Sequence, residues 1–376
     1  MHWSTARVAA QAPAQGSEPR SLSATYGGDF LIGTAIDFTE TAPLTPQELA
    51  IIKTHFNVIT PENSMKPASI HPAEDQWNWA MADTLVKFCG DNNIQVVGHC
   101  LVWHAQTGRW FFGGENGRPV TREKALERMK QHIMTEVGHF KGKLKGWDVV
   151  NEAISDRGPG DTENLRSAPW LTAIGPDYIN YAFKFAHEAD PDAELYYNDY
   201  GIEKGNKRKS SVLLLKRLIS EGVPIKAVGI QGHWGLNNLP YEELDAAISE
   251  YEALGLHVNI TEMDITMRGQ GGGQLTPDGA PTTATAASGP ATGPGRGRGL
   301  GRGPITPPTP EQLVAQAQAY AKFFQIFEKH KDAIDRVTFW GLNDARSWRR
   351  GQAPLLLDGQ NKPKPALTAI LEAKVN

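Results

Sequence analysis

The chain has 376 residues, of which 40% are hydrophobic and 21% are charged, and its formal net charge is −4 at pH 7. A chain of this length can bury one large core, and no run of about 18 apolar residues suggests a membrane-spanning helix. The small negative charge gives no general reason to expect a nucleic-acid partner. These properties predict a globular protein without a membrane span.

The N-terminal region and the cysteines add two expectations. Residues 1–27 are rich in Ala, Pro, Gln and Ser and contain no apolar stretch of signal-peptide length, so we expect a flexible leader. The only cysteines are Cys89, at the end of a predicted helix, and Cys100, roughly 16 Å along the following strand. A disulfide needs Cα atoms within about 7 Å of each other. We therefore expect two free thiols, which leave the redox compartment open.

From residue 30 onward, short β-rich runs alternate with longer stretches of helical periodicity. Strands are predicted at residues 30–37, 57–63, 95–104, 145–153, 194–201, 227–234, 257–265 and 336–344. Each is followed by a helical segment, which predicts an α/β protein with one domain over 28–376, a single (β/α)8 TIM barrel. A doubly wound sheet is the alternative, but "GTAIDFTE" after the first strand lacks the G-x-G-x-x-G turn.

Two helix starts carry strong capping signals. In "TPQELAIIKTHF", Thr45 is the expected N-cap, Pro46 occupies the first helical position and Glu48 stands where a capping box requires it. The segment "TPEQ" at 309–312 repeats the pattern. Both helices follow predicted strands, as the barrel requires.

A low-complexity insertion separates the seventh strand from its helix. Residues 269–308 are mainly Gly, Pro, Thr and Ala, so they lack the apolar surface needed to offset their ordering entropy. We expect a mobile loop that is dispensable for activity. Its Arg296, Arg298 and Arg302 resemble an Arg-Gly nucleic-acid segment, an alternative that salt-dependent binding of the loop would distinguish.

Two carboxylates end or nearly end buried strands. Glu152 closes the fourth strand in "GWDVVNEAIS", and Glu262 lies near the end of the seventh in "ITEMD". In a (β/α)8 barrel the active site lies at the carboxyl ends of the strands. Two glutamates facing one mouth supply the pair that glycoside hydrolysis needs, a protonated acid and an ionised partner.

These segments carry a family resemblance. "WDVVNEA" and "ITEMD" resemble the catalytic segments of the glycoside hydrolase family 10 enzymes, the retaining endo-β-1,4-xylanases. Further matching segments, in family order, are "GTAID", "PENSMKP", "HCLVWHAQ", "YYNDYG", "GIQGHW" and "TFWGLNDARSW". The resemblance covers about residues 28–372. It implies hydrolysis of internal xylan bonds with retention, without cofactor or metal.

The resemblance also assigns roles to residues. It makes Glu152 the general acid/base and Glu262 the nucleophile, with Asn151 on the sugar 2-hydroxyl and His233 hydrogen-bonded to the nucleophile. The remaining expected substrate-binding residues are Glu62, Asn63, Lys66, His99, Trp103, Gln106 and Gln231, with Trp340 and Trp348 as walls of the glycone subsites and Tyr200 as a stacking platform on the leaving-group side. Asp148, Asp199, Asp264 and Asp344 are expected to orient neighbouring groups. One departure is Gly201, where the family has Asn, so binding on the leaving-group side is expected to differ.

Several alternatives stay open. The same barrel could act on β-glucan or β-mannan, or bind carbohydrate without catalysis. The histidines could ligate a metal, but no H-E-x-x-H or comparable spacing occurs, and His104 is expected to be structural. Because polymeric xylan cannot cross a membrane, we expect an extracellular or periplasmic monomer.

Overall fold

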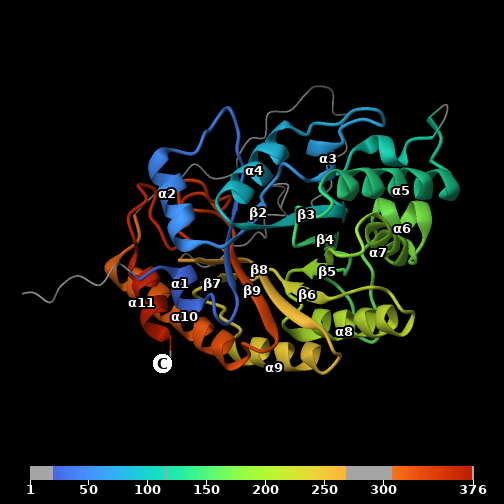
Figure 1. Ribbon diagram of the computed structural model, residues 1–376. Helices are drawn as coiled ribbons and strands as arrows, with labels where there is room; N and C mark the ends of the chain where they lie inside the picture. Colours follow the sequence, from blue (N-terminus) through green and yellow to red (C-terminus); the bar gives the residue numbers. More distant parts are fainter. Residues whose placement is uncertain (1–19, 115–116, 268–306, 375–376) are drawn as a thin grey trace, which may run out of the picture.

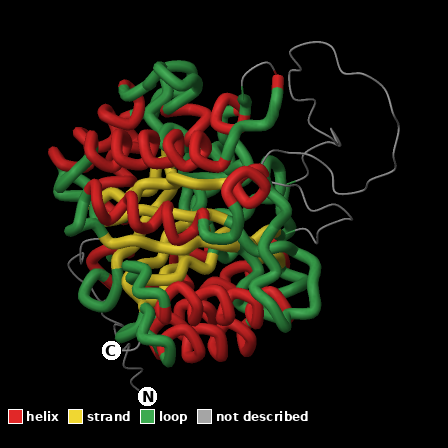
Figure 2. The backbone as a smooth tube through the Cα atoms, turned by 90° about the vertical axis from the view of Figure 1, so that its right-hand side faces the viewer, coloured by secondary structure: helices red, strands yellow, loops and turns green. Residues whose placement is uncertain are grey.

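The computed structural model describes residues 20–114, 117–267 and 307–374, which form a closed barrel of parallel strands surrounded by helices (Figures 1 and 2). The barrel strands are β1 (Leu31–Ile36), β2 (Val58–Pro61), β3 (Gln95–Trp103), β4 (Gly146–Asn151), β5 (Glu194–Asp199), β6 (Ala227–Ile230), β8 (His257–Thr266) and β9 (Ile334–Phe339). Neighbours in this order pair with one another, and β1 pairs with β9 to close the barrel. The predicted single (β/α)8 barrel is confirmed.

The prediction of one strand over 227–234 is wrong, because the structure divides this segment. After β6 the chain bends at Gly232, whose φ of 80° lies outside the range of a strand. It resumes as the short strand β7 (His233–Gly235). β6 pairs with the first half of β8, whereas β7 pairs with the second half, where His233 lies opposite Asp264.

The helices lie outside the barrel and follow the strands as predicted. They are α2 (Pro46–His55), α3 (Pro67–Ile70), α4 (Ala80–Asp91), the 3-10 helix η1 (Arg109–Phe112), α5 (Arg122–His139), α6 (Pro169–Ile174), α7 (Tyr178–Ala189), α8 (Gly205–Ser220), α9 (Tyr241–Glu252), α10 (Pro310–Lys329) and α11 (Pro365–Ala373). Both predicted capping boxes are present, at Thr45 and at Thr309.

The expectation of a flexible leader over residues 1–27 does not hold for its last part. Residues 22–26 form the helix α1 (Leu22–Tyr26), for which the expectation of flexibility is wrong. Leu22 and Tyr26 are buried, and the Tyr26 hydroxyl donates a hydrogen bond to the Ile370 carbonyl at 2.6 Å. Residues 1–19 lie outside the described part of the chain, as does the insertion expected over 269–308 except for 307 and 308.

The core fills the space between the strands and the helices. All six residues of β4 are buried, including Asp148 within the strand and Asn151 at its end, so these polar groups depend on partners inside the barrel. Cys89 and Cys100 are buried and unbridged, so the prediction of two free thiols is confirmed. Burial raises the pKa of both thiols, which makes them poor nucleophiles.

A buried carboxyl group on α5 should lower the stability of the fold. Glu136 is 0% exposed, and among the described residues its carboxyl oxygens make no hydrogen bond, although His132 Nε2 lies 3.4 Å from Oε2. Burial raises its pKa well above the ordinary 4.5. We expect Glu136→Leu to increase the free energy of unfolding by about 1–3 kcal/mol, because it removes this desolvation cost.

The pH dependence of the Glu136→Leu effect tests its cause. Because the folded-state pKa exceeds 4.5, the contribution of Glu136 to stability is complete below that pH and is lost as pH rises through the folded-state pKa. The gain in the variant should therefore grow between about pH 5 and about pH 8, measured by thermal unfolding. A Glu136→Gln variant controls for volume, and equal destabilisation by both changes at both pH values would contradict the explanation.

Candidate active site

Thirteen of the fourteen predicted site residues line one cleft. They are Glu62, Asn63, Lys66, His99, Trp103, Gln106, Asn151, Glu152, Gln231, His233, Glu262, Trp340 and Trp348. The cleft lies at the carboxyl ends of the strands, since Trp103 ends β3 and Asn151 ends β4. Among the described residues, Tyr200 is the predicted one that does not line it.

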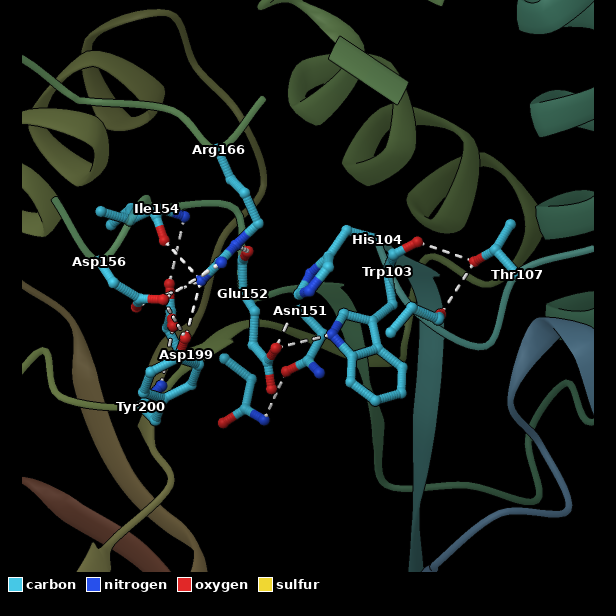
Figure 3. Close-up of polar contacts among 12 residues, drawn as sticks. Trp103, His104, Thr107, Asn151, Glu152, Ile154, Asp156, Arg166, Asp199 and Tyr200 are labelled. Carbon is cyan, nitrogen blue, oxygen red and sulfur yellow. Dashed lines mark hydrogen bonds and ion pairs between the residues drawn. The ribbon is translucent and has the colours of Figure 1, made fainter. Parts of the chain in front are cut away.

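Glu152 follows β4 directly, and only 2% of it is exposed. Its carboxyl group accepts hydrogen bonds from Trp103 Nε1 at 2.9 Å and Gln231 Nε2 at 3.0 Å, and His104 Nδ1 lies 3.8 Å from it (Figure 3). Burial, and then the negative charge of Asp199, raise the pKa of Glu152 above its ordinary value. Glu152 therefore keeps its proton to a higher pH than a solvated glutamate.

Glu262 lies within β8 and has the opposite electrostatic environment. Asn198 Nδ2 donates a hydrogen bond to Oε1 at 2.8 Å, and His233 Nε2 lies 3.1 Å from Oε2. Burial alone would raise the pKa of Glu262, but the hydrogen bond from His233, the charge of His99 and the Asn198 contact lower it below the ordinary value. The surroundings of the two carboxyl groups therefore shift their pKa values in opposite directions.

His233 carries the charge that stabilises Glu262. Its Nδ1 lies 3.1 Å from Asp264 Oδ2, which also accepts a hydrogen bond from Trp348 Nε1 at 2.9 Å. Arg349 Nε lies 3.0 Å from the other Asp264 oxygen. Burial lowers the pKa of His233, but the charge of Asp264 and the hydrogen bonds to both carboxylates raise it to about 9. A protonated imidazole therefore lies between two carboxylates.

Asn198 is a site residue that the sequence analysis did not single out. Besides its bond to Glu262, its amide nitrogen lies 2.9 Å from the Asn151 side-chain oxygen, and its carbonyl accepts a hydrogen bond from the Glu152 amide at 2.8 Å. Asn198 thus connects the surroundings of both glutamates. The available signal was its place near the end of the predicted strand 194–201, of which residues 195–199 are buried.

A polar group lies at the ends of β1 and β2. Asn63 donates a hydrogen bond to Asp37 and accepts one from the Lys66 ammonium, both at 3.2 Å. The ammonium also lies 5.1 Å from the centre of the Trp103 ring. Burial and the charge of Asp37 raise the pKa of Glu62 to about 7. Asp37 follows the first strand in "GTAID", but nothing in that segment alone pointed to its contact with Asn63.

His99 is held by charges inside the barrel. Its Nδ1 lies 2.9 Å from Asp148, whose other oxygen is 3.4 Å from Arg336. Asp148 is 1% exposed and Arg336 is 0% exposed, so this ion pair is screened from solvent. The His99 ring meets Trp340 edge-on with centroids 5.2 Å apart. Asp148 therefore orients His99, as Asp264 does His233.

The other two predicted orienting aspartates contact different groups. Asp199 accepts hydrogen bonds from the Tyr197 hydroxyl at 2.6 Å and the Ile154 amide at 3.3 Å, so it supports the segment after Glu152. Asp344 pairs with Lys364 at 3.0 Å and accepts from the Leu355 amide. Asp344 thus holds the C-terminal loop, and the expectation that it orients a site residue is wrong.

Tyr200 lies beside the cleft in a polar cluster. Its hydroxyl donates to Asp156 at 2.7 Å and accepts from Arg166 at 2.9 Å (Figure 3). The Lys207 ammonium lies 3.4 Å from the ring centroid, so it occupies one face of the aromatic ring. A sugar would have to stack on the opposite face, and the platform role of Tyr200 stays a prediction.

Metal-binding clusters and membrane-spanning helices are both absent from the described part of the chain. No group of three or more His, Cys, Asp or Glu side chains within 20–114, 117–267 and 307–374 is arranged to hold a metal ion. None of the helices in these ranges has the length and apolar composition needed to cross a membrane.

Comparison with known proteins decides the family, because glycosyl hydrolase family 10 matches residues 21–373. The chain belongs to this family. Endo-1,4-beta-xylanase A of Xylanibacter ruminicola is 39% identical over 92% of this chain and 91% of its own, and the endo-1,4-beta-xylanase of Geobacillus stearothermophilus is 37% identical over 93% and 98%. The family 10 chain described here is a glycoside hydrolase.

Solved structures agree with this assignment. A variant of the intracellular xylanase of Thermoanaerobacterium saccharolyticum, in complex with xylotriose, covers 94% of this chain and 99% of its own, at 34% identity and a TM-score of 0.78. XynB, a xylanase from Paenibacillus barcinonensis, covers 95% and 99%, at 34% identity and a TM-score of 0.81. The family 10 barrel is thus shared over nearly the whole chain.

Proposed function

We propose that this family 10 chain is a retaining endo-β-1,4-xylanase in which Glu262 is the nucleophile and Glu152 the general acid/base. The observation that carries the proposal is that the surroundings of the two glutamates shift their pKa values in opposite directions. Burial beside Asp199 favours protonated Glu152, whereas the protonated His233 favours ionised Glu262. Retaining hydrolysis needs this division of states.

The reaction has two steps. In the first, a Glu262 oxygen attacks the anomeric carbon, the bond from that carbon to the leaving-group oxygen breaks, and Glu152 gives its proton to that oxygen. In the second, Glu152 takes a proton from water as the water oxygen attacks the anomeric carbon and the bond to Glu262 breaks. Two inversions leave the configuration of the sugar unchanged.

The proposed substrate is xylan or a xylo-oligosaccharide. Relatives named as xylanases and a neighbour holding xylotriose support this choice. Asn63, Lys66 and Trp348 also line the cleft, and the family resemblance assigns them to the glycone subsites, where a hexose would need space for its extra hydroxymethyl group. A barrel acting on β-glucan or β-mannan is the alternative within the enzymes.

The test combines substrate choice with stereochemistry. Release of reducing sugars from xylan, β-glucan and β-mannan should be measured in parallel, and the first product should be followed by proton NMR. We expect release mainly from xylan, with the β-anomer formed first. Release mainly from β-glucan or β-mannan would show that the alternative substrate is the right one. An α-anomer as the first product would overturn the retaining mechanism. No release from any polymer by folded protein would favour a function in carbohydrate binding without catalysis.

The place of action follows from the substrate. Since polymeric xylan does not enter cells, we propose an extracellular or periplasmic enzyme that acts as a monomer and has no nucleic-acid partner. One similar structure is described as an intracellular xylanase, so action on imported oligosaccharides is the competing possibility. Xylanase activity in separated culture medium, periplasm and cytoplasm of the source cells would distinguish the two.

A further inference from the structure

The backbone of Glu152 has a conformation that its surroundings must stabilise. Its φ of 56° lies in the left-handed region, which non-glycine residues seldom adopt. This residue comes directly after β4, and its carboxyl group is buried. Glu152 therefore depends on contacts to its main chain as well as to its carboxyl group.

Arg166 supplies the main-chain contacts. Its Nε donates a hydrogen bond to the Glu152 carbonyl at 3.1 Å, and its Nη2 donates to the Ile154 carbonyl at 3.1 Å (Figure 3). Nη2 also donates to the Tyr200 hydroxyl at 2.9 Å, and both terminal nitrogens lie 3.3 Å from Asp156. The planar guanidinium thus joins these two carbonyls to a phenol and a carboxylate.

The position of Arg166 is itself fixed. Its amide donates a hydrogen bond to the Ala153 carbonyl at 2.7 Å, and an antiparallel bridge joins Ile154 to Leu165. Arg166 therefore belongs to a segment that pairs with the residues directly after Glu152. Its side chain is 19% exposed. Lys207 pairs with Asp156 at 3.0 Å, which anchors the carboxylate that Arg166 binds.

We propose that Arg166 is a positioning residue that holds Glu152 for proton transfer. Arg166 fixes the main chain at Glu152, while Trp103 and Gln231 hold the carboxyl group from the cleft side. Arg166 does not line the cleft, so it acts through Glu152 and not on the sugar. The inference rests on the proposed role of Glu152 as acid/base.

Leaving-group dependence separates a misplaced proton donor from general damage. A phenyl β-xylobioside needs the acid when its bond breaks, whereas a 2,4-dinitrophenyl β-xylobioside releases a phenolate that needs no proton. Because kcat/KM reports the first bond-breaking step, a misplaced Glu152 should affect the two substrates unequally. Loss of folding or of binding would affect them alike.

Two variants are needed. Arg166→Lys keeps the positive charge but loses the planar set of N–H donors, and Arg166→Met loses both. We expect kcat/KM to fall about 10- to 100-fold for the phenyl substrate and less than about 3-fold for the dinitrophenyl substrate. Glu152→Ala should show the same pattern more strongly. Arg122→Lys is the matched control, because Arg122 also forms a bidentate ion pair with an aspartate, Asp177, but does so away from the cleft.

Each outcome decides between the claims. If Glu152→Ala shows no leaving-group dependence, the acid/base role in the proposed function fails. If Glu152→Ala shows it but the Arg166 variants lower both kcat/KM values equally, or change neither, the positioning role fails. Should Arg166→Met not fold, Arg166→Lys alone decides, with its fold checked by circular dichroism.

Discussion

Glu262→Ala should abolish xylan hydrolysis, with kcat lowered on the order of 10⁴-fold or more. Alanine leaves no oxygen to attack the anomeric carbon, although the groups that held the carboxylate, Asn198 and His233, remain in place. The measurement is release of reducing sugar from xylan, together with kcat for an aryl β-xylobioside. This change should have the largest effect of any single substitution in the cleft.

Azide distinguishes a missing nucleophile from a collapsed site. The space left by Glu262→Ala admits a small anion, which attacks the dinitrophenyl substrate directly and gives the α-glycosyl azide by a single inversion. Glu250→Ala, at an exposed glutamate paired with Arg208, is the control and should keep wild-type activity. If Glu262→Ala retained about a tenth of the wild-type kcat, measured without azide at the same concentration of folded protein, Glu262 would not be the nucleophile.

The sequence was sufficient to locate the two glutamates because Glu152 directly follows the buried strand β4 and Glu262 lies in the second half of the buried strand β8. In a (β/α)8 barrel the carboxyl end of the strands is the functional face, so fold and position together point to the site. The same rule places Trp103 and Asn151, which end β3 and β4. The family resemblance then added the roles that spacing alone leaves open.

The missed or misjudged features depend on contacts between distant segments. Asp37 and Asn63 are 26 residues apart, and their hydrogen bond follows only from the pairing of β1 with β2. The break before β7 arises at Gly232, which has a positive φ. A run of residues that favour strands does not predict that conformation. Tyr200 lies just after β5 and not within it as predicted, and its surroundings are set by Arg166 and Lys207 from other segments.

Asp264→Asn should lower kcat/KM about 10- to 100-fold near pH 8, because a charge-assisted contact that keeps His233 protonated is lost. Asparagine can still accept the hydrogen bond from Trp348, so the change removes mainly the charge. Without that charge the pKa of His233 falls from about 9. Neutral His233 no longer stabilises ionised Glu262 with a full positive charge.

The pH dependence of this effect identifies its cause. In the wild type His233 stays protonated until pH rises through about 9, whereas in Asp264→Asn it loses its proton earlier. The ratio of wild-type to variant kcat/KM should therefore be smaller at about pH 5 than at about pH 8. NMR of labelled His233 should show the lower pKa directly.

A second His–Asp pair, which shares only the strand β8 with the first, provides the control for Asp264→Asn. His257 at the start of β8 lies 2.7 Å from Asp335 of β9, at the opposite end of the barrel from the cleft. Asp335→Asn removes a comparable charge next to a histidine, and kcat/KM should stay within about 2-fold of wild type at both pH values. If both substitutions lowered kcat/KM by a similar factor that did not change with pH, the loss would reflect barrel stability, and His233 would not set the charge of Glu262.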